Sequence, residues 1–428
     1  MKKIKLGDVL DVKRGASLSG QFYSNKGNYI RLTLGNFNYP NGGFKLNTAK
    51  DDLFFVGDVK PEFIMKKGDI ITPLTEQVYG LLGETATIPE DDLFIQSGDI
   101  GLIIPNPDEV DNRFVYYLVS SAIVRKQLGA AAQQTKIRHT SPEKIKDCIA
   151  FLPKMDQQKR ISMLMDNINE KIALNNKIIS ELESMAKTLY DYWFLQFDFP
   201  DENGKPYKSS GGKMVYNEEL KREIPEEWEV VEIDSLIDVK DGTHDSPKYV
   251  KKGKYLITSK HLLSTGLDYV NANKISEDDF NSINKRSKVD NGDILFSMIG
   301  ALGIVYRVNE EVIDFAIKNV ALYKASQLPF IQEYLEQTLT SVLMDVYVTR
   351  CNAGSIQKFI SLGQLRKMPI VYNKEILELY SKKVKTFFLE MDILKNENRD
   401  LASLRDFLLP MLMNGQVTFK DAAEAHND

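Results

Sequence analysis

The sequence predicts an α+β protein made of two similar modules of mixed helix and strand, each followed by one long amphipathic helix. Matching segments in the two halves of the chain indicate an internal duplication. Short apolar runs bounded by Gly, Asn and Asp are typical of strands, and two long stretches with heptad spacing are typical of paired helices. We expect mostly antiparallel or mixed sheet, and the two long helices to pair as an antiparallel coiled-coil spacer.

The composition excludes several classes of protein. With 428 residues, 43% of them hydrophobic and 27% charged, the chain has the size of two or three globular domains. The net charge of −5 argues against a uniformly basic nucleic-acid coat but leaves room for a local basic groove. Cys148 and Cys351 are too few for a disulfide framework, and the four scattered histidines do not suggest a zinc site. No leader or membrane span is apparent, so we expect a cytoplasmic protein without a membrane partner.

Three pairs of segments in the same order carry the duplication. Residues 4–15 match residues 231–242 without a gap, and both segments contain Asp-Val-Lys-x-Gly. Residues 67–71 match residues 291–295, where Gly-Asp before apolar residues predicts a turn that leads into a strand. The third pair, residues 135–141 and 355–361, precedes each long helix. Within the modules we expect one helix over about residues 114–128 and another over about residues 329–348.

Each long helix has an apolar seam at alternating spacings of four and three. The first runs from about residue 156 to 193 with Asn175 as a polar seam position, and its apolar positions are Ile161, Met165, Ile168, Ile172, Ile179, Leu182, Ala186, Leu189 and Trp193. The second runs from about residue 374 to 409, and its apolar positions are Leu377, Tyr380, Val384, Phe387, Met391, Leu394, Leu401, Leu408 and Leu412. Asn398 and Arg405 interrupt the second seam, and we expect Pro410 to kink or end the helix.

A helix of about 36 residues is roughly 54 Å long, too long to bury its stripe against one small module. The simplest partner is the other long helix, in antiparallel orientation. Alignment of the two midpoints predicts that Asn175 meets Asn398 and that the two asparagines set the helix register. The seam could serve core packing alone. Alternatively, the pair is a spacer of fixed length between two like modules, with an outer face for other subunits, which suits a DNA site with separated halves.

The joint between the modules has a distinctive sequence. Residues 188–200 read Thr-Leu-Tyr-Asp-Tyr-Trp-Phe-Leu-Gln-Phe-Asp-Phe-Pro and are followed by residues 204–212 and by Ile-Pro-Glu-Glu-Trp at residues 224–228. This joint resembles the central conserved region of specificity subunits of type I restriction–modification systems. Residues 404–417 resemble the distal conserved region of that family. Residues 153–161 resemble its Pro-x-x-x-Glu-Gln segment, with Asp156 as a small departure.

The resemblance implies two target-recognition domains, at residues 1–155 and 228–373, each reading one half of a bipartite double-stranded DNA site. It implies a central conserved helix at 156–196, a linker at 197–227, a distal conserved helix at 374–415 and a flexible tail at 416–428, with the helices setting the spacer. It also implies two methyltransferase subunits that use S-adenosylmethionine, and motor-nuclease subunits in the full complex. This chain itself would hold no cofactor and no metal.

A DNA reader needs side chains for phosphates and for base edges, and polar residues at matching places in the two repeats are the candidates. They form three groups: Lys13 and Arg14 opposite Lys240, Thr243 and His244; Arg31 and Thr33 opposite Thr258, Ser259 and Lys260; and Gln134, Thr135, Lys136, Arg138 and His139 opposite Ser355, Gln357 and Lys358. We favour the third group because both loops lie just before a long helix. For each residue, the alternative is an ordinary solvated loop position.

Catalysis by this chain has little support in the sequence. Residues 106–109, Asn-Pro-Asp-Glu, are not the Asn/Asp-Pro-Pro-aromatic motif of an adenine methyltransferase, and no glycine-rich cofactor loop accompanies them. A nuclease motif could be drawn from Pro200-Asp201 and Asp238-Val239-Lys240, but Asp11-Val12-Lys13 repeats the second part without a Pro-Asp before it. We therefore expect no catalytic residue. A scaffold that binds protein through both modules stays open as an alternative.

Overall fold

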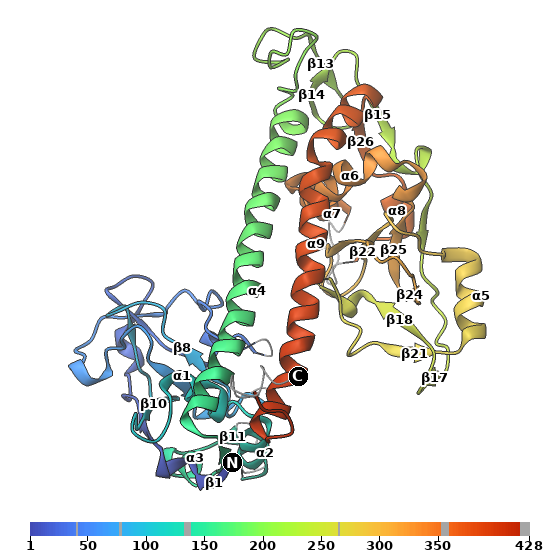
Figure 1. Ribbon diagram of the computed structural model, residues 1–428. Helices are drawn as coiled ribbons and strands as arrows, with labels where there is room; N and C mark the ends of the chain where they lie inside the picture. The colour runs from blue at the N-terminus through green and yellow to red at the C-terminus, as the bar shows by residue number, and fades with distance from the viewer. Residues whose placement is uncertain (40–41, 77–78, 132–137, 264–265, 352–358, 420–428) are drawn as a thin grey trace, which may run out of the picture. The chain divides into compact units, whose positions relative to one another are not determined.

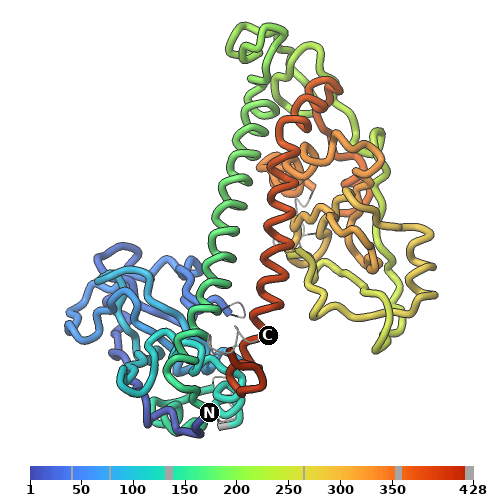
Figure 2. Tube along the Cα trace, viewed as in Figure 1, coloured from blue at the N-terminus to red at the C-terminus, as the bar shows by residue number. Residues whose placement is uncertain are grey.

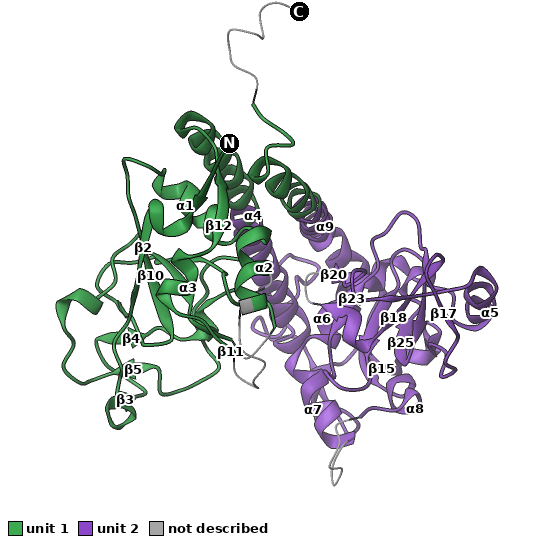
Figure 3. Ribbon diagram, turned by 90° about the horizontal axis from the view of Figure 1, so that it is seen from below, with its two compact units in different colours: residues 1–172, 400–428 green, residues 173–399 purple. Residues whose placement is uncertain are grey.

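The computed structural model describes residues 1–39, 42–76, 79–131, 138–263, 266–351 and 359–419. The chain divides into two compact units, one made of residues 1–172 and 400–428 and the other of residues 173–399 (Figure 3). Each unit contains one mixed module and a part of both long helices. No helix among the described residues is long and apolar enough to cross a membrane.

The long helices are α4 (Met155–Tyr190), which continues as a π-helical turn over Asp191–Leu195, and α9 (Lys374–Met413). The other helices are α1 (Asn112–Val119), α2 (Ala122–Ala131) and α3 (Pro142–Lys146) in the first unit, and α5 (Glu277–Ser287), α6 (Gln332–Leu339), α7 (Val342–Cys351) and α8 (Leu362–Arg366) in the second.

The strands of the first unit are β1 (Lys2–Lys5), β2 (Leu10–Arg14), β3 (Tyr23–Ser24), β4 (Tyr29–Arg31), β5 (Phe54–Phe55), β6 (Ile70–Pro73), β7 (Thr75–Glu76), β8 (Ala86–Thr87), β9 (Phe94–Ile95), β10 (Ile100–Pro105), β11 (Arg138–His139) and β12 (Ile149–Leu152). Those of the second unit are β13 (Met214–Asn217), β14 (Arg222–Pro225), β15 (Glu229–Glu232), β16 (Val239–Asp241), β17 (Tyr249–Val250), β18 (Lys254–Thr258), β19 (Leu262–Leu263), β20 (Gly266–Leu267), β21 (Asn273–Ile275), β22 (Ile294–Ser297), β23 (Val305–Arg307), β24 (Phe315–Lys318), β25 (Val320–Tyr323) and β26 (Pro369–Tyr372).

The two modules have the same sheet topology. The first has a sheet of order β2-β10-β6-β8 and a second sheet of order β3-β5-β4-β9. The second module repeats them as β16-β25-β22-β23 and β17-β21-β18-β24 (Figure 1). Antiparallel pairs prevail, and one parallel pair occurs at the same place in each module, β4 with β9 and β18 with β24. The structure thus confirms the α+β class with mixed sheets and two similar modules.

The main sheet of each module is buried on both faces. In β22, Ile294 and Phe296 pack into one apolar core while Leu295 packs into another, as the alternation of a strand requires. In β6, Ile70 and Ile71 divide in the same way between the two cores of the first module. Because the central strands β6 and β22 are buried on both faces, they form a rigid frame from which the loops project.

The two long helices run antiparallel within each unit (Figure 2). In the second unit Asn175 contacts Asn398, and Tyr380 contacts the carbonyl of Ala186. The earlier residue of α4 thus contacts the later residue of α9, as an antiparallel pair requires. In the first unit, the seam positions of α4 from Ile161 to Ile168 share a core with Leu412. The antiparallel pairing predicted from the seams is confirmed.

Three details differ from the sequence prediction. The helix expected over residues 114–128 is broken at Ser120 and Ser121 into α1 and α2, and the helix expected over residues 329–348 is broken at the matching position into α6 and α7. The backbone carbonyl of Ser121 starts the next helix, and its hydroxyl bonds to the helix before it. Pro410 does not end α9, because the helix continues past it to Met413. Phe388 rather than Phe387 is the buried member of its pair.

One ion cluster fastens the second module to α9. Arg307 on β23 donates from Nε to Glu336 Oε2 on α6 at 2.7 Å and from Nη2 to Asp392 Oδ2 on α9 at 2.8 Å. Its side chain is only 11% exposed. Although burial opposes its charge, the two carboxylates raise the pKa of Arg307 above its usual value. The module and the helix therefore share a charge network as well as an apolar core.

Residues 197–227, expected as a linker, are folded in this structure. Their β13–β14 hairpin adjoins an aromatic cluster in which Trp228 stacks on Phe199 at a centroid distance of 4.9 Å and contacts Phe194 and Phe197. The aromatic residues of the joint between the modules therefore serve packing at the end of α4.

Candidate nucleic-acid interface

The candidate interface of each module is the end of its main sheet from which the loops emerge. In the first module Ala16, just after β2, forms a parallel bridge with Ser97. In the second module Thr243, just after β16, forms the matching bridge with Lys318. The central strands continue past the sheet at the same ends, β6 into β7 and β22 into Ile299.

The glycine shared by the two Asp-Val-Lys-x-Gly segments makes this end of the sheet possible. A Cβ on Gly15 would lie 2.4 Å from the carbonyl oxygen of Ser97, and one on Gly242 would lie 2.4 Å from that of Ile317. The shared Gly-Asp has a similar reason, because Gly68 and Gly292 both have positive φ, 91° and 86°. The repeated motifs therefore encode the frame.

Cations gather around a buried acid at the end of the second module. Asp241 on β16 is 5% exposed and bonds His244 Nε2 through Oδ2 at 2.8 Å. Arg286 of α5 pairs with its other oxygen. His244 Nδ1 lies 2.7 Å from Asn319 Oδ1, and Lys318 donates to Ser246 Oγ at 2.6 Å. Asp241 thus holds the exposed side chains of His244 and Arg286 in place.

The end of the first module is built around Glu76 instead. This buried carboxylate pairs with Arg138 at 3.3 Å and accepts the backbone N–H groups of Gly80 and Leu82 at 3.1 and 3.0 Å. The Arg138 guanidinium lies 4.8 Å from the ring centroid of Tyr79, which is largely exposed. Arg14 reaches the carbonyl of Thr140 at 3.5 Å. Two predicted groups of site residues, those of Arg14 and Arg138, therefore meet at one edge.

The second predicted group has a structural task. Arg31 is buried, with an ion pair to Asp52 at 3.3 Å and its guanidinium 3.8 Å from the Tyr23 ring centroid. Thr33 and Thr258 each begin a short 3-10 turn. The backbone N–H of Thr33 donates to Asn36 Oδ1, and that of Thr258 donates to His261 Nδ1. These polar residues satisfy local backbone groups.

The remaining predicted residues lie as follows. Lys13, His139 and Lys260 are exposed, Lys240 pairs with Asp238 at 3.0 Å, and Ser259 donates to the carbonyl of Asn319 at 3.0 Å. Gln134, Thr135, Lys136, Ser355, Gln357 and Lys358 lie outside the described residues, as does most of the tail predicted at 416–428. Sequence reasoning missed Tyr79, Lys318, Ile299 and Phe359; alignment of the repeats around the shared Gly-Asp would have pointed to Ile299.

The predicted seam asparagines are in contact. Asn175 is fully buried and donates from Nδ2 to Asn398 Oδ1 at 3.0 Å and to Glu397 Oε2 at 2.7 Å, whereas its own Oδ1 has no hydrogen-bond partner. Asn398 in turn donates to Asn176 Oδ1 at 2.9 Å. A buried oxygen without a partner has a cost of about 1–3 kcal/mol, so packing alone does not favour Asn175.

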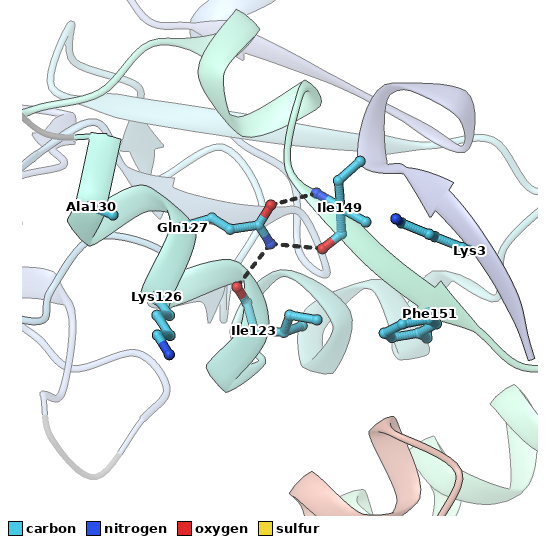
Figure 4. Close-up of a pocket in the computed structure, with 7 residues that line it drawn as sticks. All are labelled: Lys3, Ile123, Lys126, Gln127, Ala130, Ile149 and Phe151. Carbon is cyan, nitrogen blue, oxygen red and sulfur yellow. Dashed lines mark hydrogen bonds between the residues drawn. The ribbon is translucent and has the colours of Figure 1, made fainter.

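The part of the chain that the structure describes contains a buried cysteine and a pocket with a mainly apolar lining. No cluster of three or more His, Cys, Asp or Glu side chains there could hold a metal ion. A pocket between α2 and β12 is lined mainly by apolar atoms, and its Gln127 bonds to both backbone groups of Ile149 (Figure 4). Burial raises the pKa of the Cys148 thiol to about 11, which disfavours the nucleophilic thiolate.

Comparisons with known proteins agree with this architecture. Residues 1–184 match the family model for the type I restriction modification DNA specificity domain. The chain is 23% identical over 329 residues to the type I restriction enzyme MjaIX specificity subunit of Methanocaldococcus jannaschii, covering 74% of this chain and 72% of that protein. It is 22% identical over 326 residues to the EcoBI specificity subunit of Escherichia coli, covering 74% and 68%.

The fold is similar to that of the crystal structure of a type I restriction–modification S subunit from M. genitalium, with a TM-score of 0.58, 17% identity and 96% coverage of both chains. Residues 1–184 therefore match a type I restriction modification DNA specificity domain, and the chain is similar in sequence to type I specificity subunits and shares the fold of an S subunit.

Proposed function

We propose that this chain is the non-catalytic DNA-reading subunit of a type I restriction–modification complex, in which each module reads one half of a bipartite site. The paired helices set the spacer between the halves and dock two methyltransferase subunits. Those subunits would bind S-adenosylmethionine, and motor-nuclease subunits would join them in the full complex.

One observation carries the proposal: the two modules share a frame but differ in the side chains at its loop-bearing end. The frame glycines Gly15 and Gly242 are identical and make the same close approach. At the matching bridge, Ser97 of the first module is replaced by Lys318 of the second. A shared frame with different side chains at its end suits two readers of different half-sites.

The charges at these ends also suit a nucleic acid. The chain has a net charge of −5, yet Arg286 and Lys318 lie at the end of one module and Arg14 and Arg138 at the end of the other. Phosphate contacts depend on local cations rather than on the net charge.

An apolar stripe on the outer face of α4 supports the docking part of the proposal. Leu174, Ile178 and Met185 are 53%, 37% and 51% exposed, and their spacings of four and seven place them on one helix face. This stripe is separate from the buried seam of Asn175, Ile179 and Ala186. We assign it to an apolar helix face of a methyltransferase subunit, which would cover it in the complex.

The docking can be tested by co-purification of the methyltransferase subunit with the variant Leu174→Ser/Ile178→Ser/Met185→Ser. We expect this variant to recover less than a tenth of the methyltransferase subunit that the wild-type chain recovers. Lys177→Ser/Glu181→Ser, which changes exposed polar residues of the same helix, is the matched control and should recover all of it. Equal recovery by both variants would contradict the docking assignment.

Methylome sequencing tests the reading function. In a host that expresses the methyltransferase subunits, adenine methylation should occur at a bipartite motif only when this chain is also expressed. Expression of the assembled complex with an unchanged methylome would refute the proposal. The scaffold alternative predicts that the purified complex shows no sequence-dependent DNA binding. An enzymatic alternative predicts methylation or cleavage by the purified chain alone.

A further inference from the structure

We infer that Ile299 and Phe359 form an apolar contact that reads the 5-methyl group of a thymine in the half-site of the second module. This inference rests on the proposed function, since it assigns a specificity contact to the DNA-reading end of one module.

The geometry of the pair turns it away from the core. Ile299 and Phe359 are directly opposite each other in an antiparallel bridge, so their side chains project to the same side, with Cβ atoms about 5 Å apart. Their neighbours Met298 and Ile360 are buried in the core of the module. Because neighbouring residues of a strand point to opposite faces, Ile299 and Phe359 face outward, 47% and 45% exposed.

The first module has polar residues at the same place. Thr75 pairs with His139 in the β7–β11 ladder, and the buried Leu74 accepts the N–H of Thr140 at 2.8 Å. In the second module the equivalent bond joins the N–H of Ile360 to the carbonyl of Met298 at 3.4 Å. The backbone arrangement is thus repeated while a polar pair is replaced by two large apolar side chains, a change that packing of the frame does not require.

The surroundings favour DNA over a protein partner. Ser297 pairs with Val320, the first residue of β25, so Ile299 lies two residues beyond that pair, and Lys318, the last residue of β24, lies two residues before Val320 in the chain. Thr243, which bridges Lys318, is followed by His244 beside Arg286 and their shared Asp241. The apolar pair therefore lies at the sheet end that carries these basic side chains, which suits a phosphate backbone.

The chemistry selects one base. Ile299 and Phe359 have no hydrogen-bonding group in their side chains, so they cannot read the donors and acceptors of a base edge. In the major groove, the 5-methyl group of thymine is the apolar feature of the four base pairs, and apolar side chains contact it.

The test uses the complex with its methyltransferase subunits and duplexes that carry its mapped motif. Each thymine in both halves is replaced singly by deoxyuridine, which lacks only the 5-methyl group. For the wild-type complex we expect the dissociation constant to rise about fourfold at one position, the effect of losing one buried methyl group. The variant Ile299→Thr/Phe359→His, which installs the residue types of the first module, should lose this sensitivity and keep any sensitivity in the other half.

The outcomes separate the two claims. Sequence-specific binding by the wild-type complex that is indifferent to every deoxyuridine would overturn the thymine contact and leave the proposed function standing. Undiminished sensitivity in the variant would also overturn it. Binding without any sequence preference would overturn the proposed function and the contact together. The deoxyuridine scan of the wild-type complex can overturn the thymine contact even if the double variant does not fold.

Discussion

Replacement of Arg307 by Met should destabilise the second unit more than any surface ion pair could. The change leaves the side chains of Glu336 and Asp392, only 22% and 19% exposed, as two like charges without their cation. Loss of one partner from a buried ion pair has a cost of about 3–5 kcal/mol. For a unit of this size, each kcal/mol shifts the melting temperature by about 2–4 °C, so at least about 6–12 °C is expected.

Differential scanning calorimetry of the full chain measures this shift, and the transition of the second unit should fall while that of the first stays unchanged. The triple variant Arg307→Met/Glu336→Gln/Asp392→Asn removes the uncompensated charges and should recover at least half of the loss. Lys395→Met, which breaks a half-exposed pair with Glu183 on the long helices, is the control and should cost at most about 1 kcal/mol. A shift below about 2 °C in Arg307→Met, or no recovery in the triple variant, would refute the charge argument.

Three further predictions follow from buried polar and glycine positions. Asn175→Leu/Asn398→Leu should raise the melting temperature of the second unit by about 2–4 °C, because the buried Asn175 Oδ1, which has no hydrogen-bond partner, is removed. Spin labels at positions 183 and 395 of this variant should report several distances between the two long helices instead of one. A single distance without added stability would contradict a role of the asparagines in helix register. Gly15→Ala and Gly242→Ala should each destabilise their own unit by about 1–3 kcal/mol in calorimetry because of the 2.4 Å approach, whereas Gly129→Ala on α2, whose Cβ would meet no atom within 4 Å, should be neutral or stabilising. Burial, and to a smaller extent the charge of Lys260, lowers the pKa of His261 in the folded state. The unfolded state then binds the proton more readily, so the second unit should lose stability as pH falls from about 6.5 towards the folded-state pKa. The variant His261→Asn, which installs the residue type of Asn36 in the first module, should flatten this dependence of the melting temperature on pH.

The duplication was predictable because the backbone shared by the two modules requires the same residue type at matching positions. Gly15 and Gly242 cannot carry a Cβ, so the same residue stays at both places. The heptad seams were predictable for a similar reason, since burial selects apolar residues at a fixed period. The break at Ser120 and Ser121 was not predictable from periodicity, because apolar residues continue through it while one serine turns the backbone.

The candidate site was harder to predict, because the residue type does not report where a side chain points. Arg31 has the chemistry of a phosphate contact, but its guanidinium pairs with Asp52 and packs against the Tyr23 ring. Thr33 and Thr258 match each other in sequence because both cap a turn. Ile299 continues the apolar run of β22, and nothing in that run indicates that the last residue leaves the core.

The burial of each main sheet on both faces has an evolutionary consequence. The free energy that holds a module together comes from strands such as β6 and β22, whose side chains are enclosed by the two cores. Substitutions of exposed side chains at the loop-bearing end, such as His244 and Ile299, remove little of that free energy. New combinations of residues can accumulate at the end of one module without loss of the fold and without any change in the other. Such a protein can drift to a new target while it remains folded at every intermediate step.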